Sequence, residues 1–205
     1  MEKLLPKAKQ TEFHWLKLAK KRQLTKTIFF LEFEIPQSLQ VHFQFEAGQY
    51  VTLKYLSMGK WNQNDFSMTS APYEGKITLG IKINYEKSSA KDLFENLKVG
   101  DLLEVSEPKG RFTLVSKPHE FRTIIGFAGG IGITPLLSHF KNILRNEPRT
   151  RLFLFYGNKT KEDIAFKNEL DELMNSHSDR LKIYYFYSQE KIGNGLFEGR
   201  LNEKK

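Results

Sequence analysis

The chain has 205 residues, of which 40% are hydrophobic and 27% are charged, so it can bury one large or two small globular cores. Its formal net charge of +8 suits an acidic partner or a phosphorylated ligand, but no run of five basic residues occurs, which argues against nucleic-acid binding. It contains no cysteine, which excludes disulfides, thiol catalysis and a cysteine-ligated iron–sulfur cluster within this chain.

The first ten residues lack the apolar core of a signal peptide. The longest apolar run, from Ile124 to Leu137, is too short and too rich in glycine to span a bilayer. We therefore expect a soluble, cytoplasmic protein without membrane insertion.

Six short strands are predicted in the first half of the chain, because apolar residues alternate or cluster between turn-forming residues there. The predicted strands are Phe13–Leu18, Lys26–Ile35, Gln49–Tyr55, Asp65–Thr69, Lys76–Asn84 and Asp101–Ser106. Short strands at this spacing are typical of an antiparallel barrel.

One helix is predicted between the fifth and sixth of these strands. Ser89 can cap its N-terminus, with Asp92 three residues later as the partner in a capping box. Lys87, Ser88 and Ser89 then lie at a helix N-terminus, where the backbone N–H groups favour an anion. An ordinary capped helix that packs on the barrel explains the same residues equally well.

The stretch from Phe121 to Phe140 predicts a strand, a glycine loop and a helix. Phe121 to Ala128 is mostly apolar without a helical period, which predicts a strand buried on both faces of a parallel sheet. Thr134 can cap the following helix, and Pro135 suits its first turn.

Between that strand and helix lie Gly129, Gly130 and Gly132, which permit a sharp turn and a close approach to the backbone. A glycine loop that leads into a helix presents unpaired N–H groups and the positive end of the helix dipole to one point. The stretch therefore predicts a dinucleotide site, although an ordinary tight connection is the alternative.

Two further strands, Arg151–Tyr156 and Leu181–Tyr187, flank a second helix and complete a βαβαβ pattern. In such sheets ligands bind at the carboxyl ends of the strands. Those ends are Gly129–Gly132, Gly157–Lys159 and Ser188–Lys191. Because three strands are few for this kind of domain, we expect a truncated sheet with an open edge.

Several motifs occur in an order that resembles one known superfamily. They are Phe45-x-Ala47-Gly48-Gln49-Tyr50, Phe66-Ser67-Met68-Thr69-Ser70-Ala71-Pro72, Leu97-x-Val99-Gly100-Asp101, Pro108-x-Gly110-x-Phe112, Ala128-Gly129-Gly130-Ile131-Gly132-Ile133-Thr134-Pro135, Phe155-Tyr156-Gly157-Asn158 and Gly199-Arg200-Leu201. The ordered set resembles the ferredoxin–NADP reductase superfamily, most closely the bacterial reductases of the oxygenase and phenylacetate-pathway type.

This resemblance implies two domains. An antiparallel Greek-key β-barrel in residues 1–116 would bind FAD, or FMN, and a truncated Rossmann-like α/β domain in residues 117–205 would bind NAD(P)H. A hydride would pass from NAD(P)H to the flavin, and single electrons would then pass to a separate iron–sulfur protein or oxygenase. The alternative is a degenerate or truncated member that acts as a nucleotide-binding or interaction module without turnover.

The resemblance also assigns residues. Phe66 would pack on the isoalloxazine, and Ser67 and Thr134 are the candidate catalytic residues. The flavin-binding candidates are Asn64, Phe66, Ser67, Met68, Ile81, Lys82, Ile83, Lys87, Ser88 and Ser89. The candidates for the nicotinamide nucleotide are Gly129, Gly130, Gly132, Thr134, Gly157, Asn158 and Ser188.

The flavin motif departs from the family pattern of Arg-x-Tyr-Ser, because this chain has Asn64-Asp65-Phe66-Ser67. The missing arginine normally clamps a phosphate with two hydrogen bonds. Lys87 could supply the lost charge. We therefore expect weakened FAD binding, the use of FMN, or a lost flavin site.

Two points concern other ligands. Lys159 favours NADPH, whereas Gln189 and Glu190 argue against it, so the choice between NADH and NADPH stays open. No metal site is expected, because the histidines are dispersed without the spacing of metal ligands. These histidines are His14, His42, His119, His139 and His177.

Overall fold

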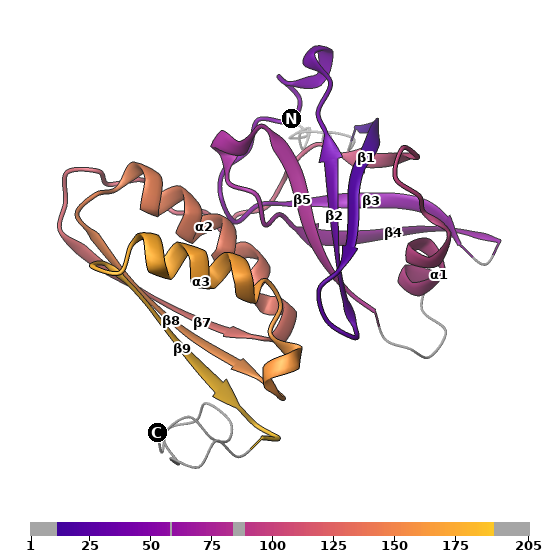
Figure 1. Cartoon of the computed structure of the whole chain (residues 1–205). Helices are drawn as coiled ribbons and strands as arrows, with labels where there is room; N and C mark the ends of the chain where they lie inside the picture. The colour runs from indigo at the N-terminus through magenta and orange to yellow at the C-terminus, as the bar shows by residue number, and fades with distance from the viewer. Residues whose placement is uncertain (1–11, 58, 84–88, 191–205) are drawn as a thin grey trace, which may run out of the picture.

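The computed structural model describes residues 12–57, 59–83 and 89–190. In this part of the chain a six-stranded antiparallel sheet precedes a three-stranded parallel sheet with two helices (Figure 1). Neither these two helices nor any other in the described residues is long and apolar enough to cross a lipid bilayer.

The first sheet is a curled half-barrel with the strand order β4-β3-β6-β1-β2-β5. Its strands are β1 (Phe13–Gln23), β2 (Ile28–Glu34), β3 (Tyr50–Ser57), β4 (Lys60–Ser67), β5 (Lys76–Lys82) and β6 (Leu102–Ser106). Its two outer strands approach each other where Met68 pairs with Leu79, and the Thr69 N–H donates to the Thr78 carbonyl at 2.8 Å. The prediction of an antiparallel barrel is therefore confirmed at the level of a six-stranded, curled sheet.

Two strands are longer than predicted, because backbone pairing continues through polar residues. β1 runs on to Gln23, which pairs with Phe29 of β2. β4 begins at Lys60, which pairs with Ser57 of β3. One face of each strand is in solvent, so polar side chains there do not interrupt the ladder of hydrogen bonds.

Helix α1 (Ser89–Asn96) packs against one end of the half-barrel. Leu93 is 7% exposed and belongs to the barrel core. The ring of Phe94 lies 3.5 Å, centroid to centroid, from that of Phe29. The apolar side of the predicted helix therefore closes the core of the first sheet.

The second sheet has the parallel order β7-β8-β9, as the βαβαβ pattern predicts. Its strands are β7 (Arg122–Gly129), β8 (Thr150–Asn158) and β9 (Leu181–Tyr187), and its helices are α2 (Ile133–Asn146) and α3 (Lys167–Ser176). Four single 3₁₀ turns complete the described elements: η1 (Gln37–Leu39), η2 (Pro72–Glu74), η3 (Gly130–Gly132) and η4 (Lys161–Asp163).

The prediction that β7 is buried on both faces is wrong. Exposed and buried residues alternate along β7. Ile125 is 54% exposed and Phe127 is 67% exposed, whereas Gly126 and Ala128 are buried. Successive neighbouring strands joined by right-handed crossovers place both helices on the same side of a sheet. The other face carries an aromatic row, in which Phe155 stacks on Phe127 at 5.2 Å and on Tyr184 at 5.1 Å.

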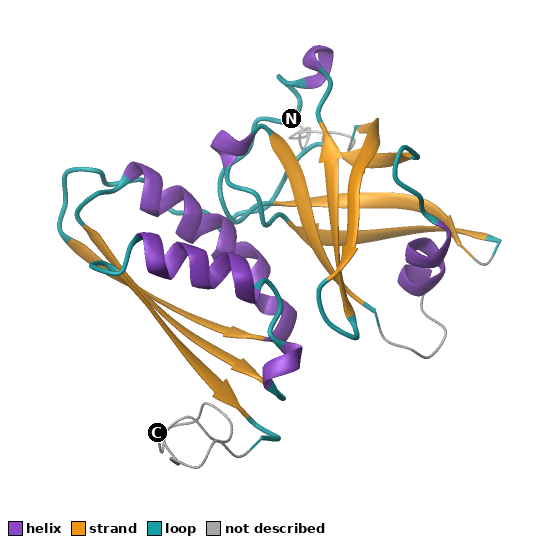
Figure 2. Ribbon diagram, viewed as in Figure 1, coloured by secondary structure: helices purple, strands orange, loops and turns teal. Residues whose placement is uncertain are grey.

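Helices α2 and α3 lie between the parallel sheet and the half-barrel (Figure 2). Leu137 and Phe140 of α2 are buried at helical spacing. They share one buried cluster with Ile28 and Phe30, which come from the outer side of β2. The two halves of the chain are therefore joined by apolar packing.

Candidate functional site

The loop after β7 keeps its backbone accessible. Gly129 is extended, with φ −127° and ψ 122°, whereas Gly130 has a φ of +50° that favours glycine. A Cβ atom added to Gly129, Gly130 or Gly132 would meet no other atom within 4 Å. At Gly129 and Gly132 neither packing nor backbone conformation requires glycine, so the missing side chains leave room for a group to reach the backbone.

Thr134 does not cap α2, contrary to the prediction. Helix α2 begins at Ile133 with Gly132 as its N-cap, and no side chain caps it. The reason is that η3 already turns the chain, so Thr134 lies in the first helical turn and its hydroxyl donates to the Ile131 carbonyl at 3.1 Å. The Ile133 N–H already donates to carbonyls of η3, but no side chain caps the N–H groups that follow it in the first turn of α2, which can meet an anion.

The three strand ends meet at one edge of the sheet, as predicted. Gly129 pairs with Gly157, Asn158 pairs with Tyr187, and the Ser188 N–H donates to the Asn158 carbonyl at 3.0 Å. Both polar atoms of the Asn158 side chain are buried and have no hydrogen-bond partner. Leaving such a group unpaired costs about 1–3 kcal/mol, so Asn158 is suited to a polar ligand at this edge.

A polar chain links β4, β3 and α1. The Tyr55 hydroxyl donates to Oδ1 of Asn64 at 2.7 Å and lies 3.1 Å from the Ser89 hydroxyl. The structure thus brings Asn64 and Ser89 together, through a tyrosine that the sequence did not single out. Ser89 is the first residue of α1 rather than the residue before it, and Lys87 and Ser88 lie outside the described residues.

The other flavin candidates differ in what they can offer. Phe66 is half-buried against the barrel core, and Ser67 is half-buried at the end of β4. The side chains of Met68, Ile81 and Ile83 are at most 2% exposed, so only their backbone atoms can meet a ligand. Lys82 is exposed.

The two halves of the candidate site touch at Gly80 of β5. A Cβ atom there would lie 2.9 Å from Cγ2 of Thr134 and 2.9 Å from the ring of Phe166. Leu79, the residue before it, pairs with Met68, which follows Ser67. The candidate catalytic residues Ser67 and Thr134 therefore lie close to the same junction, one on each domain.

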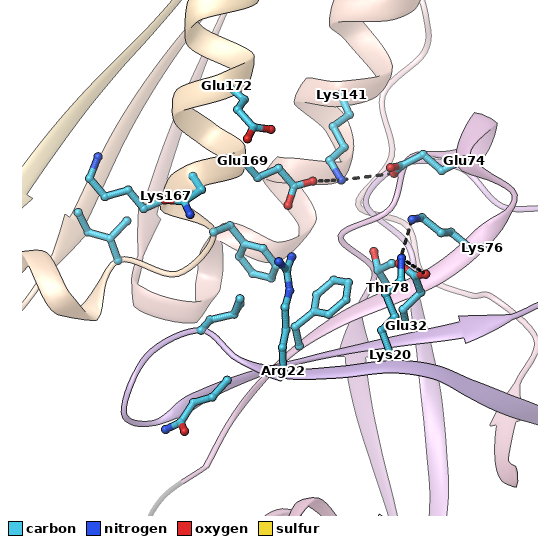
Figure 3. A pocket seen from close by; sticks show the side chains of 16 residues that line it. Lys20, Arg22, Glu32, Glu74, Lys76, Thr78, Lys141, Lys167, Glu169 and Glu172 are labelled. Carbon is cyan, nitrogen blue, oxygen red and sulfur yellow. Dashed lines mark hydrogen bonds and ion pairs between the residues drawn. The ribbon is translucent and has the colours of Figure 1, made fainter. Parts of the chain in front are cut away.

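A charged pocket of about 600 Å³ lies beside this junction (Figure 3). Lys141 of α2 is 7% exposed and lies between Glu74, at 3.3 Å, and Glu169 of α3. Glu32 is paired with Lys20 at 3.0 Å and with Lys76 at 2.9 Å. The Lys141–Glu74 pair joins the two domains, whereas the pairs of Glu32 lie within the half-barrel.

The ionisation of Glu32 reflects this pairing. Burial raises the pKa of the Glu32 carboxyl, but the hydrogen bonds from Lys76 and Lys20 outweigh it and hold that pKa below its ordinary value. Charges paired in this way neutralise one another and do not attract a free anion. Sequence reasoning did not select Lys141 as a site residue. It lies four residues after Leu137, on the apolar side of the helix, and a lysine at such a position could have been recognised as buried and paired.

His139 joins the domains at a second point. Its Nε2–H donates to the Phe112 carbonyl at 2.8 Å, and a Cβ atom on Gly48 would lie 2.2 Å from the same nitrogen. Burial lowers the pKa of His139, although its hydrogen bond to Phe112 acts in the opposite direction. His139 therefore packs between the two domains.

The histidines are less dispersed than the sequence indicates. The rings of His14 and His42 lie 4.7 Å apart, because the turn after η1 folds back over the start of β1. The spacing of the histidines along the sequence does not show that this pair lies close together in the fold.

Two family models match the chain. The oxidoreductase FAD-binding domain matches residues 15–114, and the oxidoreductase NAD-binding domain matches residues 127–205. One component of the 1,2-phenylacetyl-CoA epoxidase of Escherichia coli is 30% identical over 195 residues, which are 95% of this chain and 55% of that protein. NADH-cytochrome b5 reductase 1 of Dictyostelium discoideum is 38% identical over 148 residues, which are 71% of this chain and 50% of that protein.

Solved structures share the fold. The CS-b5R domains of human Ncb5or, in the NAD+ form, superpose with a TM-score of 0.81 and 25% identity, covering 96% of this chain and 57% of that one. The ferredoxin-NADP+ reductase of Plasmodium falciparum superposes with a TM-score of 0.77 at 20% identity, covering 88% of this chain and 75% of that one. The chain spans only about half the length of the curated relatives it matches.

Proposed function

Because the chain belongs to the oxidoreductase family in which an FAD-binding domain precedes an NAD-binding domain, we propose that it carries a hydride from NAD(P)H to FAD and single electrons onward to a separate acceptor. The observation that supports this most directly is the contact at Gly80. It places the open glycine loop of one domain against the strand of the other that adjoins the flavin motif.

The NAD(P)H half of the proposed site fits its ligand. The backbone from Gly129 to Gly132 can approach a pyrophosphate, and the uncapped N-terminus of α2 can stabilise its charge. The unpaired amide of Asn158 can bind the nicotinamide or its ribose, with Gly157 and Ser188 beside it. Thr134 fixes the start of α2 against β5 and so sets the distance between the two halves.

The flavin half fits its ligand less fully. Phe66 offers a ring for stacking, and the hydroxyl of Ser67 can donate a hydrogen bond at the site of hydride transfer. Asn64 carries no charge, and its Oδ1 already accepts from Tyr55. Asp65 accepts a hydrogen bond from Thr52 at 2.6 Å and adds a negative charge. We therefore propose that FAD binds, but more weakly than a site with an arginine at position 64 would bind it.

When bound, FAD supplies the chemistry that converts a two-electron donor into a one-electron donor, while the protein holds and orients the partners. The relatives are named as a subunit of an epoxidase and as a cytochrome b5 reductase, so the acceptor that we propose is a separate iron–sulfur protein or oxygenase. The absence of cysteine places any iron–sulfur centre outside these 205 residues. The net charge of +8 favours an acidic surface on that partner.

Anaerobic reduction tests the proposal. The purified protein is loaded with FAD, dialysed and mixed with NADH or NADPH, while the visible absorbance of the flavin is followed. Bleaching by one of the two nucleotides is the expected result, and the faster one identifies the donor. A protein that binds FAD and nucleotide without bleaching would instead be an interaction module without turnover, which is the alternative favoured by the missing arginine.

A further inference from the structure

A second group of chemically active side chains lies away from the junction, where β1 begins. Glu12 directly precedes β1, His14 lies at its start, His42 lies in the turn after η1, and Glu107 directly follows β6. One ligand atom of each residue lies within 4.8 Å of those of the other three. Three separate parts of the sequence therefore meet at one point.

The backbone fixes these residues in place. β1 and β6 are antiparallel, with His14 opposite Val105, and the Glu107 N–H donates to the Glu12 carbonyl at 3.1 Å. Phe43 is 3% exposed in the barrel core and anchors the turn that carries His42. The convergence thus follows from the sheet and its core.

One nitrogen in this group has no partner. Nε2 of His14 is buried and makes no hydrogen bond, and it lies 3.7 Å from Oε1 of Glu107. Nδ1 of His42 lies 2.7 Å from the same oxygen. Buried polar atoms are normally paired, so the unpaired nitrogen beside a carboxylate and a second imidazole indicates a ligand shared by all of them.

We propose that Glu12, His14, His42 and Glu107 bind a zinc ion. Two imidazole nitrogens and two carboxylate oxygens are donors that Zn²⁺ accepts, and imidazole favours it over magnesium or calcium. With bonds of about 2.0–2.1 Å, tetrahedral ligand atoms lie about 3.3 Å apart, so the group needs to contract by only ~1.5 Å at its widest. Glu12 is exposed and His42 is 38% exposed, which gives the ion a route from solvent.

The bound ion would tie the start of β1, the turn after η1 and the end of β6 into one unit. This site does not depend on the proposed oxidoreductase function, because none of its residues contacts the junction at Gly80. Its physical effect is a cross-link within the half-barrel. Such a link raises the free energy of unfolding. Once the zinc concentration exceeds the dissociation constant of the site, this gain grows with the logarithm of the ratio between the two.

Calorimetric titration of the full, untagged chain with Zn²⁺, after treatment with a chelator, tests the site. We expect one ion per chain. His14→Gln and His42→Gln should each lower the affinity at least about 100-fold, since even residues that merely orient metal ligands are worth 10–100-fold. His42 lies in a half-exposed turn, so its variant tests the proposal even where His14→Gln disturbs the strand.

The matched control is His119→Gln. His119 is exposed, and it accepts a hydrogen bond from Arg149 through its backbone carbonyl, which the substitution keeps. This variant should keep the affinity of the original chain. Co²⁺ should also give the intense visible band of a four-coordinate site, and both histidine variants should lose it. Equal zinc affinity in His42→Gln and His119→Gln, or a stoichiometry far below one, would overturn the proposal.

Discussion

Replacing Gly80 with alanine should slow the reduction of the flavin because the new methyl group pushes the two domains apart. Carbon atoms in ordinary contact lie about 3.5–4.0 Å apart, whereas this methyl group would lie 2.9 Å from Thr134 and Phe166, an overlap of about 0.6–1.1 Å. If the second domain recedes by that amount, the glycine loop that we propose to hold NAD(P)H moves with it. A displacement of about 1 Å is enough to cost roughly 100-fold in the rate of a well-positioned reaction.

The effect on stability should be smaller. Overpacking of this kind costs about 1–3 kcal/mol in the free energy of unfolding, which leaves most domains folded. Stopped-flow mixing of the FAD-loaded variant with excess NAD(P)H, under anaerobic conditions, measures the reduction rate, and urea denaturation measures the stability. Because excess nucleotide saturates the protein, a lower rate then reports slower hydride transfer and not weaker nucleotide binding.

Ile77→Val is the matched control for this experiment. Ile77 lies in the same strand and is fully buried in the barrel core, so its truncation costs about 0.5–1.5 kcal/mol without a new contact at the second domain. Its reduction rate should be unchanged. A Gly80→Ala protein that folds and reduces its flavin within about twofold of the original rate would refute the argument from a rigid junction.

Three further outcomes are expected. Gly132→Ala should leave the unfolding free energy nearly unchanged, because the φ of Gly132 is −61° and a Cβ atom there would meet nothing within 4 Å. The same variant should weaken NAD(P)H binding in a fluorescence titration. Unchanged affinity would mean that no ligand approaches this backbone. Tyr55→Phe should lower FAD affinity in an absorbance titration, because Asn64 loses its hydrogen-bond donor and shifts, whereas Tyr73→Phe, outside this polar chain, should not. Burial raises the pKa of Glu147, but hydrogen bonds from Arg122, Thr150 and Lys117 outweigh burial and hold that pKa below its ordinary value of about 4.5. The ionised carboxylate therefore stabilises the fold fully at a pH above 4.5. This stabilisation is lost as the pH falls through the lowered pKa of the folded state. Glu147→Gln should therefore cost about 3–5 kcal/mol near neutral pH and give a flatter acid limb in urea unfolding; an acid limb as steep as that of the original chain would contradict this assignment.

Much of the fold could be predicted because local patterns determine it. Alternating or clustered apolar residues between turn-forming residues predicted the strands of both sheets, and glycines followed by helical periodicity located the loop after β7 and helix α2. The faces of β7 could not be predicted, since an apolar run shows that a strand can be buried but not which neighbours cover it. Ile125 and Phe127 are apolar and yet exposed, because both helices lie on the opposite side.

The candidate site was predictable only where it is continuous in sequence. The glycine loop is one such segment. Its place at the carboxyl ends of the strands could be predicted because ligands bind at that edge of a parallel sheet. The link from Asn64 through Tyr55 to Ser89 depends on the register of β3 and β4 and on the position of α1, which no local pattern encodes. The same holds for His14 and His42, which are brought together by a turn after η1.

The helix layer between the two sheets has a consequence for how the chain unfolds. Because α2 and α3 are covered by the parallel sheet on one side and by the half-barrel on the other, removal of either sheet exposes apolar surface that both halves share. Two segments that match separate domain families would then melt as one cooperative unit, with a calorimetric enthalpy that matches the van't Hoff enthalpy. Local opening at the edge where we propose that the nucleotide binds would have to occur without breaking this layer, which confines it to the loops at the strand ends.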